Sequence, residues 1–162
     1  MFDKHLIVLT EKALTPIAKV LVSKKISANT ITIFGFFVGL ISVLCISQNM
    51  FLSGLLFLLV NRVFDGLDGI VARLTSSSDN GAFLDITLDF VFYGLFPLGF
   101  VISNPDQNSL PGIVLVVSFF ATGSSFLGFS ILAERRQLKV KHHTKNKGIY
   151  YIESFIEGGE TA

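Results

Sequence analysis

The most prominent pattern in the chain is an apolar run without any charged residue between Lys25 and Arg62. About 20 residues cross the hydrocarbon core of a bilayer, so this run is too long for one span and must fold back on itself. The polar stretch 47–49, which reads SQN, is the natural turn. The pattern therefore predicts one helix over roughly 30–47 and a second over roughly 51–73.

Two further charge-free runs follow, one on each side of Asp106. The stretch 103–108, which reads SNPDQN, separates them and is rich in turn-forming residues. We therefore expect a third helix over roughly 80–102 and a fourth over roughly 110–134. Only helices or closed barrels satisfy their backbone polar groups in lipid, so the expected fold class is all-α. The predicted architecture is a multi-pass transmembrane helix bundle with about four spanning helices.

The amino-terminal segment has a different pattern, in which apolar residues recur at helical spacing and charged residues occupy the rest of the helical wheel. This pattern predicts an amphipathic helix over 1–24 that lies at the membrane interface. Charged residues such as Asp3, Glu11 and Lys12 interrupt any signal-peptide core. A frayed helical extension of the first span is the alternative interpretation.

Composition supports a membrane protein, because 51% of the 162 residues are hydrophobic and only 15% are charged. A soluble domain is typically about 25% charged, so this chain could not cover an ordinary water-facing surface. A soluble enzyme, a disordered protein and a nucleic-acid module are excluded as first interpretations. The net charge of +1 gives no overall field that would attract nucleic acid, so we expect no nucleic-acid partner.

Basic residues are distributed on one side of the predicted helices. All 13 Lys and Arg precede the first helix, lie in the second half of the second helix, or follow the fourth. The positive-inside rule then predicts that both termini and the loop between the second and third helices are cytoplasmic. The bacterial inner membrane is the expected location, with an endomembrane as the alternative. We expect a single membrane domain over 1–162, with a cytoplasmic basic tail over 135–162.

Four acidic residues, Asp65, Asp68, Asp85 and Asp89, lie within or at the ends of predicted spanning helices. An ionisable residue at membrane depth costs a few kcal/mol, so it indicates function by default. Like charges that lie close together also repel one another, and a divalent cation would compensate for that repulsion. A site made of oxygen ligands favours Mg²⁺, Mn²⁺ or Ca²⁺ over zinc.

Residue spacing places these acids on two helical faces. Positions three and four apart share one face, which groups Asp65, Asp68 and Ala72 on the second helix, and Gly81, Asp85 and Asp89 on the third. The two helices are expected to be antiparallel and joined by a short loop, so their acidic faces can meet. Gly69 and Gly81 remove side-chain bulk there, and Arg73 can reach a phosphate. Taken singly, each Asp is also compatible with a helix cap and each Gly with helix packing.

This set of residues resembles the signature of the CDP-alcohol phosphatidyltransferase family. That signature reads D-x2-D-G-x2-A-R followed by G-x3-D-x3-D, and residues 65–89 contain all of its specified residues. The chain departs from the family pattern in the spacing of the motif and in the number of spanning helices, and it also differs at position 28. Seven residues, 74–80, separate the two halves of the motif where the family usually has eight, and Ala28 replaces a common proline. Family members also usually have six spanning helices, so we expect a chain that is truncated or naturally shortened at its carboxyl end, where 149–162 looks like the start of another helix.

The resemblance implies both an activity and its residues. The activity is transfer of a phosphatidyl group from a CDP-linked lipid, such as CDP-diacylglycerol, to a small alcohol with release of CMP, in phospholipid biosynthesis. The cofactor would be Mg²⁺ or Mn²⁺ in a two-metal site, and a homodimer is implied. The implied residues are Asp65, Asp68, Asp85 and Asp89 for the metals, Asp68, Gly69, Ala72, Arg73 and Gly81 for CDP, and Asp89 as the general base.

The acceptor alcohol and the activity itself leave alternatives open. Arg135 and Arg136 are candidates for binding an acceptor phosphate, although a positive-inside loop or a contact with anionic lipid explains them equally well. One alternative function is a catalytically inactive remnant that binds CDP-lipid. The other is a membrane transport protein, because intramembrane Asp residues also mark ion pathways.

Overall fold

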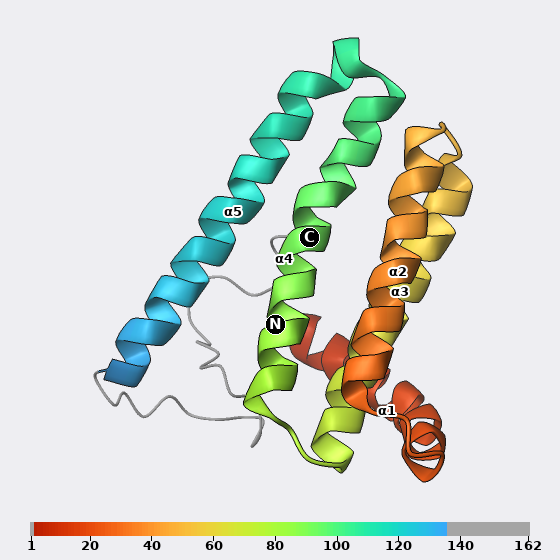
Figure 1. The fold of residues 1–162 in the computed structure, drawn as a ribbon, viewed down its shortest axis with the longest axis vertical. Helices are drawn as coiled ribbons and strands as arrows, with labels where there is room; N and C mark the ends of the chain where they lie inside the picture. The colour runs from red at the N-terminus through yellow and green to blue at the C-terminus, as the bar shows by residue number, and fades with distance from the viewer. Residues whose placement is uncertain (1, 136–162) are drawn as a thin grey trace.

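The computed structural model describes residues 2–135, which form five helices and no strand within that range (Figure 1). The all-α prediction is confirmed. The helices are α1 (Phe2–Ser23), α2 (Ala28–Ser47), α3 (Phe51–Leu74), α4 (Asp79–Ser103) and α5 (Pro105–Arg135). The tail beyond 135, with its predicted start of a further helix, lies outside the described residues.

Helices α2 to α5 run up and down along one common direction, and α1 crosses near one end of them (Figure 1). The central element is α2, which packs against both α3 and α4, while α1 packs on α3 and α5 packs on α4. Within residues 2–135, the backbones of α3 and α4 do not approach each other as each approaches α2. The two motif helices therefore face each other across a space that α2 closes on one side.

Two glycines of α2 let this helix approach α3 and α4 closely. A Cβ atom placed on Gly35 would lie 2.8 Å from the Cβ of Phe64 in α3, and one on Gly39 would lie 2.8 Å from Cε2 of Phe92 in α4. Real Cβ atoms do not come this close, so glycine is required at both positions for the observed packing. Glycine on α2 thereby sets the separation of the two motif helices.

Helix ends follow local capping chemistry. The Ser27 and Ser78 side chains accept hydrogen bonds from backbone N–H groups at the starts of α2 and α4, as is typical of N-cap residues. The start of α5 differs from the sequence prediction by five residues, because α5 begins at Pro105 rather than near 110. Proline suits the first helical position, where its missing N–H has no intrahelical partner. The turn-forming stretch is therefore mostly the first turn of a helix, and Asn104 alone separates α4 from α5.

Three of the described helices, α2, α4 and α5, are long and apolar enough to cross a membrane. The second predicted span corresponds to α3, which has 24 residues but carries four charged residues: Arg62, Asp65, Asp68 and Arg73. Because of these charges, α3 is not apolar enough to be assigned as a membrane span from its hydropathy. The fourth span therefore remains a prediction, which rests on the length of α3 and its packing along α2.

The amino-terminal helix is a separate element rather than an extension of α2. It ends at Ser23, and Lys25 takes a left-handed backbone conformation with φ of 57° before α2 begins at Ala28. Its buried Ala18 belongs to a small apolar core with residues of α2 and α3, among them Ile31 and Val71. The alternative of a frayed extension of the first span is thus wrong, and a position at the membrane interface stays a prediction.

Candidate functional site

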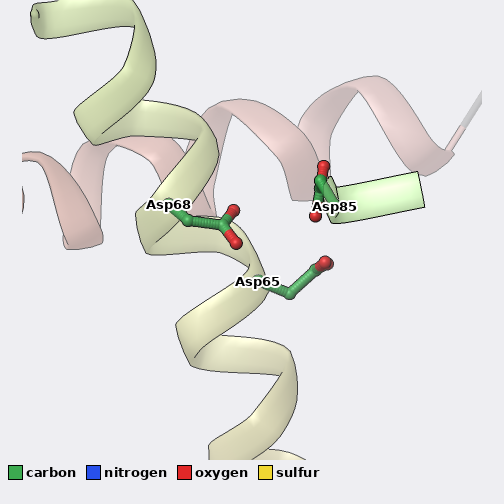
Figure 2. A group of neighbouring side chains, drawn as sticks. All are labelled: Asp65, Asp68 and Asp85. Atoms are coloured by element: carbon green, nitrogen blue, oxygen red, sulfur yellow. The ribbon is translucent and has the colours of Figure 1, made fainter. Parts of the chain in front are cut away.

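Three of the four predicted metal ligands lie together (Figure 2). Asp65 and Asp68 come from α3 and Asp85 comes from α4, and their side chains point toward one another across the space between these helices. One carboxylate oxygen from each residue lies within 4.8 Å of the others. Asp68 is only 5% exposed, while Asp65 and Asp85 are half-buried. The spacing of three residues in α3 therefore does produce a shared face, and α4 supplies the third acid.

The donor set and its spacing fit a hard divalent cation. Carboxylate oxygens are the ligands that Mg²⁺ and Ca²⁺ prefer, and Mn²⁺ accepts the same ligands. Oxygen ligands of one octahedral Mg²⁺ ion are about 3.0 Å apart when adjacent and about 4.2 Å apart when opposite, because each metal–oxygen bond is about 2.1 Å long. The observed separations of up to 4.8 Å would have to shorten toward these values through side-chain rotation. Asp65, Asp68 and Asp85 therefore fit a cation held between the two motif helices.

These acids line a pocket whose other walls come from α2 and from the next turns of α3 and α4. Its lining comprises Thr32, Gly35, Phe36, Asn61, Asp65, Asp68, Asp85, Leu88, Asp89 and Phe92. The cavity volume is about 20 Å³, which is enough for a water molecule or an ion and far too small for a nucleotide. A ligand larger than a water molecule or an ion would therefore have to lie mostly outside this pocket.

Asp89 lies one helical turn beyond Asp85 and also lines the pocket, but it is not part of the group of three. Its Oδ1 atom lies 3.8 Å from Nη2 of Arg62 in α3. The fourth acid of the motif is thus outside the group of three, and its carboxylate lies beside the Arg62 guanidinium. This separation distinguishes Asp89 from the three clustered acids, whereas residue spacing alone grouped all four.

Arg62 is a site residue that the sequence analysis counted only among the basic residues used for orientation. Its Nη1 atom lies 3.9 Å from Asp65, and its guanidinium lies over the ring of Phe92 at 5.4 Å from the centroid. Its Nε and Nη2 atoms donate hydrogen bonds of 3.0 and 2.7 Å to Oδ1 of Asn61. The signal available in the sequence was its position three residues before Asp65, on the same helical face.

Asn61 is a second residue that the sequence analysis missed. It is 5% exposed, and its Nδ2 atom donates a hydrogen bond of 2.9 Å to the backbone carbonyl of Gly35 in α2. Its amide therefore fixes α3 against α2 and at the same time holds Arg62. A single polar residue near the middle of a predicted span was the available signal, because buried amides in lipid need partners.

The predicted CDP-binding residues other than Asp68 lie away from the pocket wall. They are Gly69, Ala72, Arg73 and Gly81, of which Gly69, Ala72 and Arg73 continue along α3 toward its end and Gly81 lies in the first turn of α4. All four are half-buried. A Cβ on Gly81 would lie 2.9 Å from Oδ1 of Asn29 in α2, so the missing side chain at this position accommodates a neighbouring residue.

Arg73 forms an ion pair with a residue from the amino-terminal helix. Its Nη2 atom donates a hydrogen bond of 2.6 Å to Oε1 of Glu11 in α1. The sequence analysis assigned Glu11 no role beyond interrupting a signal peptide. Of the two predicted acceptor-phosphate residues, Arg135 is exposed at the end of α5 and does not line the pocket, and Arg136 lies outside the described residues.

Comparisons with known proteins agree with the motif. Residues 25–155 match the sequence model of the family described as CDP-alcohol phosphatidyltransferase. The chain is 39% identical over 161 residues to Inner membrane protein YnjF of Escherichia coli, which covers 99% of this chain and 78% of that protein. It is 29% identical over 135 residues to Phosphatidylcholine synthase of Pseudomonas aeruginosa, covering 72% of this chain and 56% of that protein.

A shorter match links the chain to an archaeal protein. The chain is 41% identical over 81 residues to Archaetidylinositol phosphate synthase of Pyrococcus horikoshii, which covers 49% of this chain and 43% of that protein. The relatives thus include proteins that are named as synthases and one that is named only by its membrane. The family match extends over most of the chain, and the chain is an integral membrane protein of the CDP-alcohol phosphatidyltransferase family.

Proposed function

We propose that the protein transfers a phosphatidyl group from a CDP-linked lipid, such as CDP-diacylglycerol, to the hydroxyl of a small alcohol and releases CMP. The observation that carries this proposal is the cluster of Asp65, Asp68 and Asp85 between α3 and α4, with Asp89 set apart in the same pocket. A metal-binding group and a separate carboxylate are what a displacement at a diphosphate requires.

The three clustered acids would hold the cation centre, together with Asp89 if two ions bind. Bound Mg²⁺ or Mn²⁺ would neutralise charge on the attacking and leaving oxygens of the displacement. The protein's part is to hold these ligands in position. Asp68 is nearly buried and belongs to α3, and the Asn61 hydrogen bond fixes α3 against α2. The ligand geometry is therefore built into helix packing rather than into a loop.

Asp89 would act as the general base. In the reaction, the alcohol oxygen forms a bond to the lipid-bearing phosphorus while the bond from that phosphorus to the CMP oxygen breaks. The hydroxyl proton moves to the Asp89 carboxylate, and CMP departs with its phosphate ionised. Nη2 of Arg62 lies 3.8 Å from Oδ1 of Asp89, so a cationic side chain lies beside the proposed base.

The nucleotide would lie over the ends of the motif helices, because the pocket itself is too small for it. Gly69, Ala72 and Gly81 would leave room there for CDP, and the guanidinium of Arg73 would bind its diphosphate. In the cell, the positive-inside pattern supports a site and both termini on the cytoplasmic side of a bacterial inner membrane. A homodimer, and an acceptor phosphate bound by Arg135 and Arg136, remain parts of the proposal that rest on the sequence.

The test is CMP release by the purified full-length chain in detergent or proteoliposomes. The reaction contains CDP-diacylglycerol, Mg²⁺ or Mn²⁺, and a pool of small alcohols that includes glycerol phosphate, serine and inositol phosphate. We expect CMP release that needs both the metal and an alcohol, and that is lost in Asp89→Asn. Metal-dependent binding of CDP-diacylglycerol without CMP release would instead identify an inactive remnant. Neither binding nor release, together with ion flux through proteoliposomes, would favour a transport protein.

A further inference from the structure

A polar contact joins the amino-terminal helix to the motif. Glu11 and Arg73 are separated by 62 positions, yet their side chains form a direct hydrogen-bonded ion pair of 2.6 Å. Glu11 is 39% exposed and Arg73 is 24% exposed, so the pair lies at the edge of the protein interior. A charge-assisted hydrogen bond of this length is among the stronger polar contacts that proteins make.

The position of Glu11 is set by the packing of α1 on α3. Leu14, one turn further along α1, packs against Gly66 of α3. A Cβ atom added to Gly66 would lie only 2.9 Å from Cδ1 of Leu14. Ala18, one turn further again, is fully buried in the core that α1 shares with α2 and α3. Glu11 therefore lies on the helical face that contacts α3, because positions 11, 14 and 18 share a face. Its carboxylate is presented to α3 by a rigid helix rather than by a loop.

The geometry of the pair leaves part of the guanidinium directed toward the motif. Glu11 engages Nη2 of Arg73, whereas Nη1 lies 3.3 Å from where a Cβ on Gly69 would be. The side chain is thus folded back along α3, over the motif glycine, and held at its other terminal nitrogen. A guanidinium is a planar fork of donors, so holding one nitrogen orients the whole group.

We infer that Glu11 is a positioning residue, which holds the Arg73 guanidinium over Gly69 so that it can bind the diphosphate of the CDP-linked substrate. This inference rests on the proposed function, in which Arg73 binds that diphosphate. It makes α1, which lies outside the family motif, part of the nucleotide site. Without Glu11, the long Arg73 side chain would have to be ordered when the nucleotide binds, and such ordering weakens affinity.

The test compares Glu11→Gln with wild type in two measurements, the KM and kcat for CDP-diacylglycerol and the Kd for CDP by titration calorimetry in the presence of Mn²⁺. We expect KM and Kd to rise about 3- to 10-fold, as when one long side chain must be immobilised on binding, with kcat changed by less than about twofold. Glu11→Asp should recover part of the loss, because it retains the charge. The matched control is Lys12→Gln, which removes a charge from the neighbouring exposed position and should leave both constants unchanged.

A second pair of variants separates positioning from a structural role. If Glu11 acts through Arg73, then Glu11→Gln should change the CDP affinity of an Arg73→Gln protein by less than about twofold, which is the signature of coupling in a double-mutant cycle. An equal loss in both backgrounds would overturn the inference. Equal or tighter CDP binding by Glu11→Gln alone would overturn it as well. If wild type itself neither binds CDP nor releases CMP, the proposed function fails first and the inference fails with it.

Discussion

Replacing Asp68 by Asn should stabilise the metal-free protein and reduce the further stabilisation that metal binding gives. Asp68 is 5% exposed, and its carboxylate lies within 4.8 Å of both Asp65 and Asp85. Without a cation, this arrangement brings like charges together in a partly desolvated space. With a cation, the same carboxylate is a ligand. The substitution keeps the size of the side chain and removes only its charge.

The magnitude follows from the separation of the carboxylates. Two unit charges 4.8 Å apart, which is the largest separation in the group, repel by about 3.5 kcal/mol at an effective dielectric constant of about 20, before screening is taken into account. Asp65 and Asp85 are half-buried, and Arg62 lies 3.9 Å from Asp65, so screening reduces the sum. We expect Asp68→Asn to stabilise the metal-free protein by about 1–3 kcal/mol, which raises the Tm by several degrees.

Metal binding should offset this gain. A cation present at 100 times its Kd stabilises the folded wild type by about 2.7 kcal/mol. Asp68→Asn loses a ligand and should lose most of that gain. The measurement is thermal unfolding of the purified protein in detergent, first in EDTA and then with increasing Mn²⁺. The matched control is Asp79→Asn, which removes an exposed acid in the first turn of α4 and should leave the Mn²⁺-induced shift of Tm unchanged.

One outcome would refute this reasoning. If Asp68→Asn has a lower Tm in EDTA and keeps the full shift in Mn²⁺, the three carboxylates neither repel one another nor bind the cation. Asp68 would then be a buried polar residue whose charge stabilises the helix packing.

Three further substitutions test other parts of the site. Asp89→Asn should lower CMP release by about 10²- to 10⁴-fold, as for loss of a general base, and should retain most of the Mn²⁺-induced shift of Tm. If that shift is lost instead, Asp89 acts mainly as a metal ligand. Gly39→Ala should destabilise the protein by about 1–3 kcal/mol, because its Cβ would lie 2.8 Å from Cε2 of Phe92. Gly94→Ala is the control and should not destabilise it, because no neighbouring atom lies within 4 Å of a Cβ there. Equal Tm values for the two variants would contradict the observed packing. Asn61→Leu should cost about 1–3 kcal/mol in chemical unfolding, because a buried hydrogen bond to α2 and two from the neighbouring guanidinium are lost; an unchanged free energy of unfolding would show that these bonds contribute nothing net.

Much of the fold was predictable because hydrophobic runs and helical spacing are local properties. Charge-free runs of span length predicted four of the five helices, and amphipathic spacing predicted α1. The boundaries agree within two residues except at Pro105, where turn-forming residues make the first turn of a helix. Turn propensity and helix-start propensity overlap for proline, so the sequence pattern could not separate them there.

The candidate site was predictable within each helix, and the meeting of the two acidic faces was expected as well, but which acids of the two faces come together was not. Spacing placed Asp65 and Asp68 on one face of α3, and Asp85 and Asp89 on one face of α4. Spacing could not show that α3 and α4 pack on α2 rather than on each other. In this arrangement Asp85 lies with the acids of α3, and Asp89 lies beside Arg62. That difference depends on the relative rotation and separation of two helices.

The sequence by itself determined that the chain is helical, that it belongs in a membrane and that its acidic residues form a family motif. Each of these follows from residue type and spacing along one segment. Only the tertiary structure decided which residues of different helices meet. Asn61 hydrogen-bonds across to α2, and Glu11 of α1 pairs with Arg73 of α3, 62 positions away. The physical reason is that periodicity describes the faces of one helix, whereas contacts between helices depend on close packing at glycine positions such as Gly35 and Gly39.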